Sequence, residues 1–149
     1  FVEDERTPRP RLVHRLDKDT SGALLVAPAP TLAVAAPGVP TTLTPLPEAE
    51  VRAAPPGASF VILTHDHALD FLIAAEALSR RDAAWVGMIG SHSKRASFAR
   101  HAARAGVDPA PLVCPIAATA PRDKRPEIIA AFAAAEIMAA LITHARVPA

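Results

Sequence analysis

Two short stretches of the sequence carry the side chains best suited to hold an anionic ligand. The first is THDHALD, residues 64–70, which follows the apolar run 60–63. The second is GSHSKR, residues 90–95, which follows the apolar run 85–89. A glycine turn that leads into a helix presents free backbone amides and the positive end of the helix dipole, which favours phosphate. A plain strand-to-helix turn with a solvated basic face is an equally good interpretation on spacing alone.

The two stretches together define what we call the rim. Asp66 or Thr64 is expected to accept the first amides of a following helix, which leaves the imidazoles free to donate. Lys94 and Arg95 would reinforce the glycine turn with charge-assisted hydrogen bonds. The side chains predicted to bind a cofactor are Thr64, His65, Asp66, His67, Gly90, Ser91, Ser93, Lys94 and Arg95.

A metal site is the alternative interpretation of residues 64–70, because two histidines near carboxylates can ligate zinc. The stretch superficially resembles the THxHxDH motif of the metallo-β-lactamase superfamily. That motif needs aspartate and histidine where this sequence has Leu69 and Asp70. We therefore predict no metal.

Strand and helix patterns alternate from residue 59 onward, which predicts an α/β fold with a mainly parallel sheet. The carboxyl ends of parallel strands share one edge of the sheet, and ligands bind there. The two stretches of the rim are therefore expected to lie side by side. The predicted strands are 60–63, 85–89 and, as strand or loop, 112–116; the predicted helices are 66–80, one that starts at Ser91 or Ser93 and stops near Gly106, and 126–142.

Details of these elements give further expectations. The apolar face of helix 66–80 should include Leu72. Gly87, inside a strand, marks a place where another group approaches the backbone closely. Cys114 is expected to be a small core residue. In the last helix, the residues expected to face the core are Ile128, Phe132, Ala135, Ala139 and Ile142.

Composition limits the class of protein. Half of the 149 residues are hydrophobic and the net charge is +1, which fits a globular domain without general affinity for nucleic acid or membrane surfaces. Cys114 is the only cysteine, so an internal disulfide is excluded and a cytoplasmic location is expected. We also expect no membrane segment, since no apolar run approaches the ~20 residues that span a bilayer.

The N-terminal part carries a different motif, HRLDKDTSG, at residues 14–22. It resembles the signature of the RNA pseudouridine synthases that modify ribosomal and transfer RNA. The resemblance implies that Asp17 is the catalytic carboxylate, a group able to attack a flipped uridine. That family also requires a later tyrosine, and this sequence has none. A severed fragment with a solvated Asp17 is therefore the preferred interpretation, and RNA is a partner only under the alternative.

Prolines separate this fragment from the α/β part. Eight of the sixteen prolines lie between residues 28 and 57, where they disfavour long regular elements. Short strands remain plausible at 24–27, 31–35 and 41–44, and a helical turn at 47–51. We divide the chain into a pseudouridine-synthase-like fragment, a proline-rich join and an α/β half-domain, with bounds 1–27, 28–46 and 47–149.

Within residues 47–141, four separated motifs resemble the C-terminal domain of the XdhC family, the xanthine dehydrogenase accessory factors. They are LTHDHALDF, AWVGMIGSHSKRASF, LVCPI and DKRPEIIAAFAAAEI, in the order of the family. The resemblance implies a partial Rossmann-like three-layer domain, here preceded by a short non-homologous segment.

The same resemblance implies a function. XdhC proteins bind the molybdenum cofactor, a molybdopterin, protect it while its terminal sulfur is installed, and deliver it to xanthine dehydrogenase. The pterin phosphate or its attached nucleotide would bind at residues 90–95, and residues 64–70 would line the other side of the pocket. Such a protein acts as a chaperone for the cofactor, without turnover of its own, and its partner is a xanthine dehydrogenase-type molybdoenzyme.

The sequence also departs from the XdhC pattern. It has no glycine-rich GAGHVG-type turn and no counterpart of the family's N-terminal domain, and Ala117 replaces the glycine of the family's CPIG. Three hypotheses therefore stay open: a cofactor-binding accessory protein, a pseudouridine synthase using Asp17, and a non-functional fused fragment. The fusion would leave one strand missing from the sheet, and the open edge would favour a homodimer.

Overall fold

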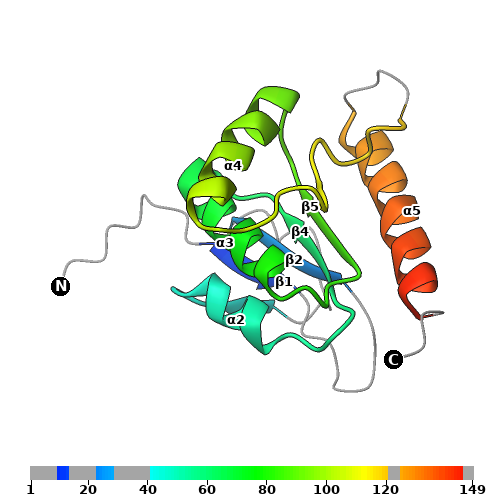
Figure 1. Ribbon diagram of the computed structural model, residues 1–149. Helices are drawn as coiled ribbons and strands as arrows, with labels where there is room; N and C mark the ends of the chain where they lie inside the picture. Colours follow the sequence, from blue (N-terminus) through cyan, green and yellow to red (C-terminus); the bar gives the residue numbers. More distant parts are fainter. Residues whose placement is uncertain (1–9, 14–22, 29–40, 121–124, 146–149) are drawn as a thin grey trace.

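The computed structural model describes residues 10–13, 23–28, 41–120 and 125–145 (Figure 1). The HRLDKDTSG motif with Asp17 and the predicted strand 31–35 lie outside the described residues. In chain order the elements are β1 (Pro10–Val13), β2 (Ala23–Pro28), β3 (Thr41–Leu43), α2 (Pro47–Ala53), β4 (Ser59–Ile62), α3 (His67–Ser79), β5 (Trp85–Met88), α4 (His92–Arg104), β6 (Leu112–Val113) and α5 (Pro126–Ala145).

One mixed sheet runs through the domain in the order β3-β1-β2-β4-β5-β6. β2, β4, β5 and β6 are parallel, whereas β1 and β3 are antiparallel to their neighbours. The mainly parallel α/β fold is thereby confirmed. β4 pairs with β2, with Leu24 opposite Phe60, so the missing strand that we expected leaves no open edge at β4. Strands from all three predicted segments thus share one sheet, and their separate origin stays a prediction.

The core of the domain lies between the sheet and three helices. Parallel strands that advance in one direction along a sheet place their right-handed crossover helices on the same face, and α2, α3 and α4 do lie on one side of the strands (Figure 1). Every second strand residue points to this face, as Phe60 and Ile62 do from β4. They pack against fully buried helical residues such as Ile73 and Phe98. Leu72, predicted to be in this core, is 46% exposed instead.

α5 covers the opposite face and completes the three layers (Figure 1). Val61, Trp85, Ile116 and Ala117 form a second apolar cluster there with Ala133 of α5. The helical residues that pack on this cluster are Ile129, Phe132, Ile137 and Ala140.

The predicted inner face of α5 was therefore partly wrong. Ile128 and Phe132 are half-buried, as expected, but Ala135, Ala139 and Ile142 are exposed. The helix is apolar all round, so its hydrophobic periodicity does not select one face. The position of Glu136 shows which side of α5 faces the sheet, because its carboxylate accepts a hydrogen bond from the amide of Ala117 at 3.0 Å.

The expectation that no stretch could span a membrane was also wrong. Among the described residues, Pro126–Ala145 is long and apolar enough by length and composition, with a mean hydropathy of 1.9. Glu127 and Glu136 interrupt the apolar run in the sequence. The mean hydropathy of the helix nevertheless stays high enough for a membrane-spanning helix. The finding is weak evidence for a membrane role, because the inner side of α5 packs on the sheet.

Two glycines have the roles that the sequence predicted. A Cβ at Gly87 would lie 1.9 Å from the Trp85 ring, so the indole packs directly on this backbone. Gly106 follows α4 with a φ of +69°, in the left-handed region where glycine is favoured after a helix.

Candidate anion-binding rim

The sheet brings the two stretches of the rim to one edge. β4 and β5 run parallel, with Ile62 opposite Met88 at their carboxyl ends. The amide of Ile89 then donates to the carbonyl of Ile62 at 2.9 Å, which holds the two strand ends together. The expectation that both stretches share one edge is confirmed.

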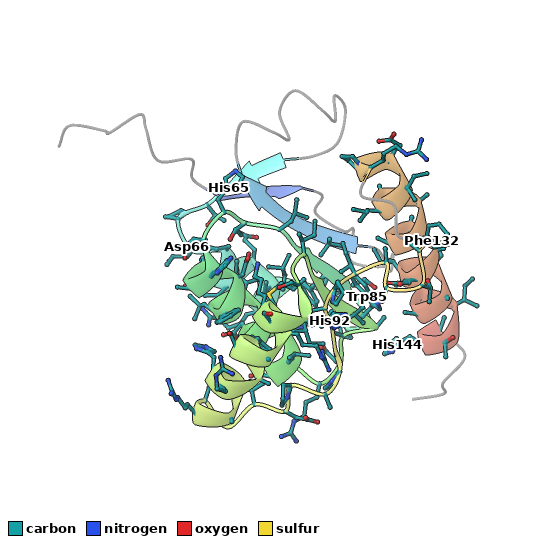
Figure 2. The ribbon with its side chains drawn as sticks, turned by 90° about the horizontal axis from the view of Figure 1, so that it is seen from above. His65, Asp66, Trp85, His92, Phe132 and His144 are labelled. Carbon is teal, nitrogen blue, oxygen red and sulfur yellow. The ribbon has the colours of Figure 1, made fainter. Side chains whose placement is uncertain are left out.

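The loop between β4 and α3 is shaped by its own polar groups. Asp66 is the N-cap of α3 and accepts the amides of Ala68 and Leu69, at 2.8 and 3.4 Å. His65, Asp66 and His67 are exposed, and Figure 2 shows His65 and Asp66 in the loop that leads into α3. The predicted cap is confirmed, and both imidazoles face solvent.

The central residue of the rim is one that sequence reasoning did not select. Asp70, in the first turn of α3, is completely buried. One of its oxygens accepts the amide and the hydroxyl of Thr64, at 2.9 and 2.6 Å. The other forms an ion pair with the ammonium group of Lys94. A buried carboxylate requires such partners, because leaving it unpaired costs several kcal/mol.

Lys94 connects the two halves of the rim. Its side chain is only 11% exposed, and its ammonium group donates to Asp70 and, at 2.9 Å, to the carbonyl of Ile89. An ammonium group has three protons, and the third has no acceptor among the described residues. The stem of Lys94 lies on Gly90, where a Cβ would come within 2.5 Å of it. A side chain at position 90 would therefore have to displace the stem of Lys94.

The N-terminus of α4 presents free donors at the same edge. Ser91 is the N-cap and accepts the amide of Lys94 at 3.3 Å. The amides of His92 and Ser93 have no acceptor among the described residues. Both residues are exposed, and His92 lies at the start of the helix in Figure 2. These amides and the helix dipole give the rim a positive character.

Arg95 and Cys114 connect the rim to β6 and the segment that follows it. Arg95 donates to the carbonyl of Leu112 in β6, so it braces the sheet and does not extend into solvent. The thiol of Cys114 is buried and lies 3.8 Å from the carbonyl oxygen of Ser91. Burial raises the pKa of this thiol, while the charges of Lys94 and Arg95 act in the opposite direction. The thiol is therefore protonated at neutral pH and packs as a small core residue.

Two other features concern alternative sites. Within the part of the chain that the structure describes, no three metal-ligating side chains gather in one place.

A hollow of about 510 Å³ lies at the opposite edge of the sheet, around Trp85 at the amino end of β5. Among the described residues that line it, Ser79, Arg81 and Asp108 carry hydroxyl or charged groups. A ligand in this hollow would not reach the rim.

The structure therefore brings together Thr64, Gly90, Ser91 and Lys94 of the predicted site, and adds Asp70. The signal that could have revealed Asp70 is its place in the first turn of a helix otherwise rich in apolar residues. A carboxylate there must either face solvent or find a cation, and Lys94 is the cation that follows the neighbouring strand.

The fold is that of a Rossmann-type α/β domain, with the candidate rim at the carboxyl ends of its parallel strands. The family model of the XdhC Rossmann domain matches residues 10–137, so the chain belongs to the XdhC family. The match starts well before residue 47, where the sequence resemblance began, and includes β1 and β2. Membership indicates an XdhC-like accessory role toward xanthine dehydrogenase. No curated protein and no solved structure matches the chain.

Proposed function

We propose that this chain binds the molybdenum cofactor at the rim and serves, in the cytoplasm, as an accessory protein for a xanthine dehydrogenase-type molybdoenzyme. Under this proposal it holds and transfers the cofactor and has no turnover of its own. The cofactor's phosphate, or the nucleotide attached to it, binds at the N-terminus of α4.

The observation that carries the proposal is the fixed set of donors around Gly90. The amides of His92 and Ser93 point out of the helix start without an acceptor among the described residues. Lys94 adds one more hydrogen-bond donor, and its ion pair with the buried Asp70 holds it in place. This set suits a phosphate because every group is a donor and none has to move.

Residues 64–67 supply the second wall of this proposed site. Thr64 is fixed by Asp70, whereas His65 and His67 are exposed and able to donate to polar groups of the ligand. Asp66 is occupied with the amides of α3, which reduces its repulsion of an anion. Both walls therefore present hydrogen-bond donors, as an anionic cofactor requires.

Thermal unfolding in the presence of the molybdenum cofactor tests this proposal. A ligand that binds only the folded chain at a hundred times its Kd adds about 2.7 kcal/mol to the free energy of unfolding, so the midpoint must rise. Ser93→Glu places an acid in the first turn of α4. It should preserve or slightly raise the stability of the free protein, by about 0.3–1 kcal/mol, because acids are favourable at a helix N-terminus.

The same acid would repel the phosphate, so Ser93→Glu should lose most of the cofactor-induced rise. Ala103→Glu is the matched control, with the same charge on the exposed side of the same helix but near its other end. It should keep the rise. Equal rises in Ser93→Glu and Ala103→Glu, or no rise in the parent, would contradict the proposal.

A further inference from the structure

The outer side of α5 is an apolar surface without a partner among the described residues. Of the twenty residues of this helix, only Ala133 is buried. Met138 is 55% exposed and Ile142 is 49% exposed, two of the largest exposed hydrophobic side chains of the domain. Glu127 is the only charged residue on this outer side between residues 126 and 143.

Three exposed residues and the half-buried Leu141 follow a regular spacing along this side. Ala131, Ala134, Met138 and Leu141 recur at intervals of three, four and three residues, which is the seam of a helix that packs along another helix. Ala135 and Ile142 flank this seam. We call these six residues the α5 stripe.

We propose that the α5 stripe is a self-association surface, on which the α5 stripe of a second copy of this chain packs in antiparallel orientation. The sequence predicted self-association through a sheet edge left open by a missing strand, but in the structure β2 pairs with β4. The α5 stripe offers a different surface for the same event, independent of the rim and of any cofactor.

The distribution of side-chain sizes favours a second copy as the occupant. The first half of the stripe is made of alanines, and the second half holds Met138, Leu141 and Ile142. In an antiparallel pair centred on residue 136, Ala134 lies opposite the partner's Met138 and Ala131 lies opposite the partner's Leu141. Each large side chain then meets a small one, the arrangement that lets two layers interdigitate without voids.

The charges favour the same orientation. A parallel pair would place the two Glu127 carboxylates beside each other, and like charges at close range are unfavourable. An antiparallel pair places the two Glu127 carboxylates at opposite ends of the interface. Opposite helix dipoles also align favourably in this arrangement.

The size of the α5 surface determines how tightly the two copies are expected to bind. Twenty helical residues extend about 30 Å, and one helix pair of this length is at the lower end of specific interfaces. The dimer should therefore be weak and should depend on protein concentration in the micromolar range or above.

Sedimentation velocity of the full chain over a hundredfold range of concentration tests the proposal. The parent should shift from monomer toward dimer, and Met138→Glu should stay monomeric at every concentration. Leu46→Glu is the control, because Leu46, at 56% exposed, is as exposed as Met138 but lies before α2. It should associate like the parent.

Disulfide trapping tests the orientation. Mild oxidation of a mixture of Ala134→Cys and Met138→Cys should give mainly the mixed dimer, because these positions face each other in the antiparallel pair. The parent, whose Cys114 is buried, shows the background. A parallel pair would instead give the Ala134→Cys homodimer, and that result would overturn the orientation.

Two results would overturn the whole proposal. One is a parent chain that remains monomeric at the highest concentration. The other is association that Met138→Glu leaves intact, which would assign it to a different surface. If the monomeric parent bound vesicles of neutral phospholipid and Met138→Glu did not, the stripe would be a lipid-binding surface and the dimer would be wrong.

Discussion

α2, α3 and α4 close one face of the sheet with fully buried side chains such as Phe98, whereas α5 covers the other face with a single buried residue, Ala133. The rim belongs to the first face. Asp70 and Lys94 come from α3 and α4, two helices of that face, and they form an ion pair. The comparison shows that one face fixes the side chains of the rim, while the other leaves one side of α5 exposed.

The largest contrast between the two faces should appear when a phenylalanine is truncated on each. Phe98→Ala removes a completely buried ring and should lower the free energy of unfolding by about 4 kcal/mol. Phe132→Ala removes a half-buried ring of α5 and should cost about 1–2 kcal/mol, in proportion to its smaller buried area. Urea unfolding monitored by the single Trp85 measures both. Equal losses of unfolding free energy in the two variants would contradict the difference between the two faces.

The ion pair of the rim should contribute more than an exposed pair on the same face. Asp70→Ala leaves Lys94 without its partner in a nearly buried position and should cost about 3 kcal/mol. Glu76→Ala breaks the pair with Arg52, whose side chain is 56% exposed, and should cost about 0.5 kcal/mol or less. Similar losses for the two variants, in the same urea titration, would show that Asp70 is not the anchor of the rim.

Gly87→Ala tests the packing on the α5 face. The new methyl group would overlap the ring of Trp85, which must move against α5, at a cost of about 2 kcal/mol. Gly106→Ala has free space around it and a positive φ, so it should cost only about 1 kcal/mol of backbone strain. Trp85 fluorescence should change in the first variant and stay unchanged in the second. An unchanged spectrum for Gly87→Ala would contradict the close contact.

Ala117→Gly is expected to have the smallest effect, and in the stabilising direction. Ala117 has a φ of +55°, in the left-handed region that glycine adopts without strain. Relief of this strain should exceed the loss of one buried methyl group by about 0.5–1 kcal/mol. The midpoint of urea unfolding measures the change. A destabilised variant would mean that the methyl group in the second apolar cluster matters more than the backbone.

The sequence predicted the elements well where one local pattern was sufficient. The apolar runs of β4 and β5, the cap at Asp66 and the glycine after α4 depend on neighbouring residues, and the structure confirms them. The loops of the rim met as predicted because parallel strands bring their carboxyl ends together.

Contacts between distant residues were not predictable in the same way. Asp70 appeared unremarkable because its partner, Lys94, is twenty-four residues away. The inner face of α5 was misassigned because an alanine-rich helix has no strong periodicity, and the choice depends on the bond between Glu136 and Ala117. The pairing of β2 with β4 requires long-range register that a proline-rich sequence does not reveal.

The molybdenum content of the protein after gel filtration with the molybdenum cofactor tests the central claim most directly. We predict stoichiometric molybdenum in the parent and in Ala103→Glu, and little in Ser93→Glu, because only the last places a negative charge at the free amides of α4. Molybdenum that co-elutes equally with all three proteins, or with none of them, would contradict cofactor binding at the rim.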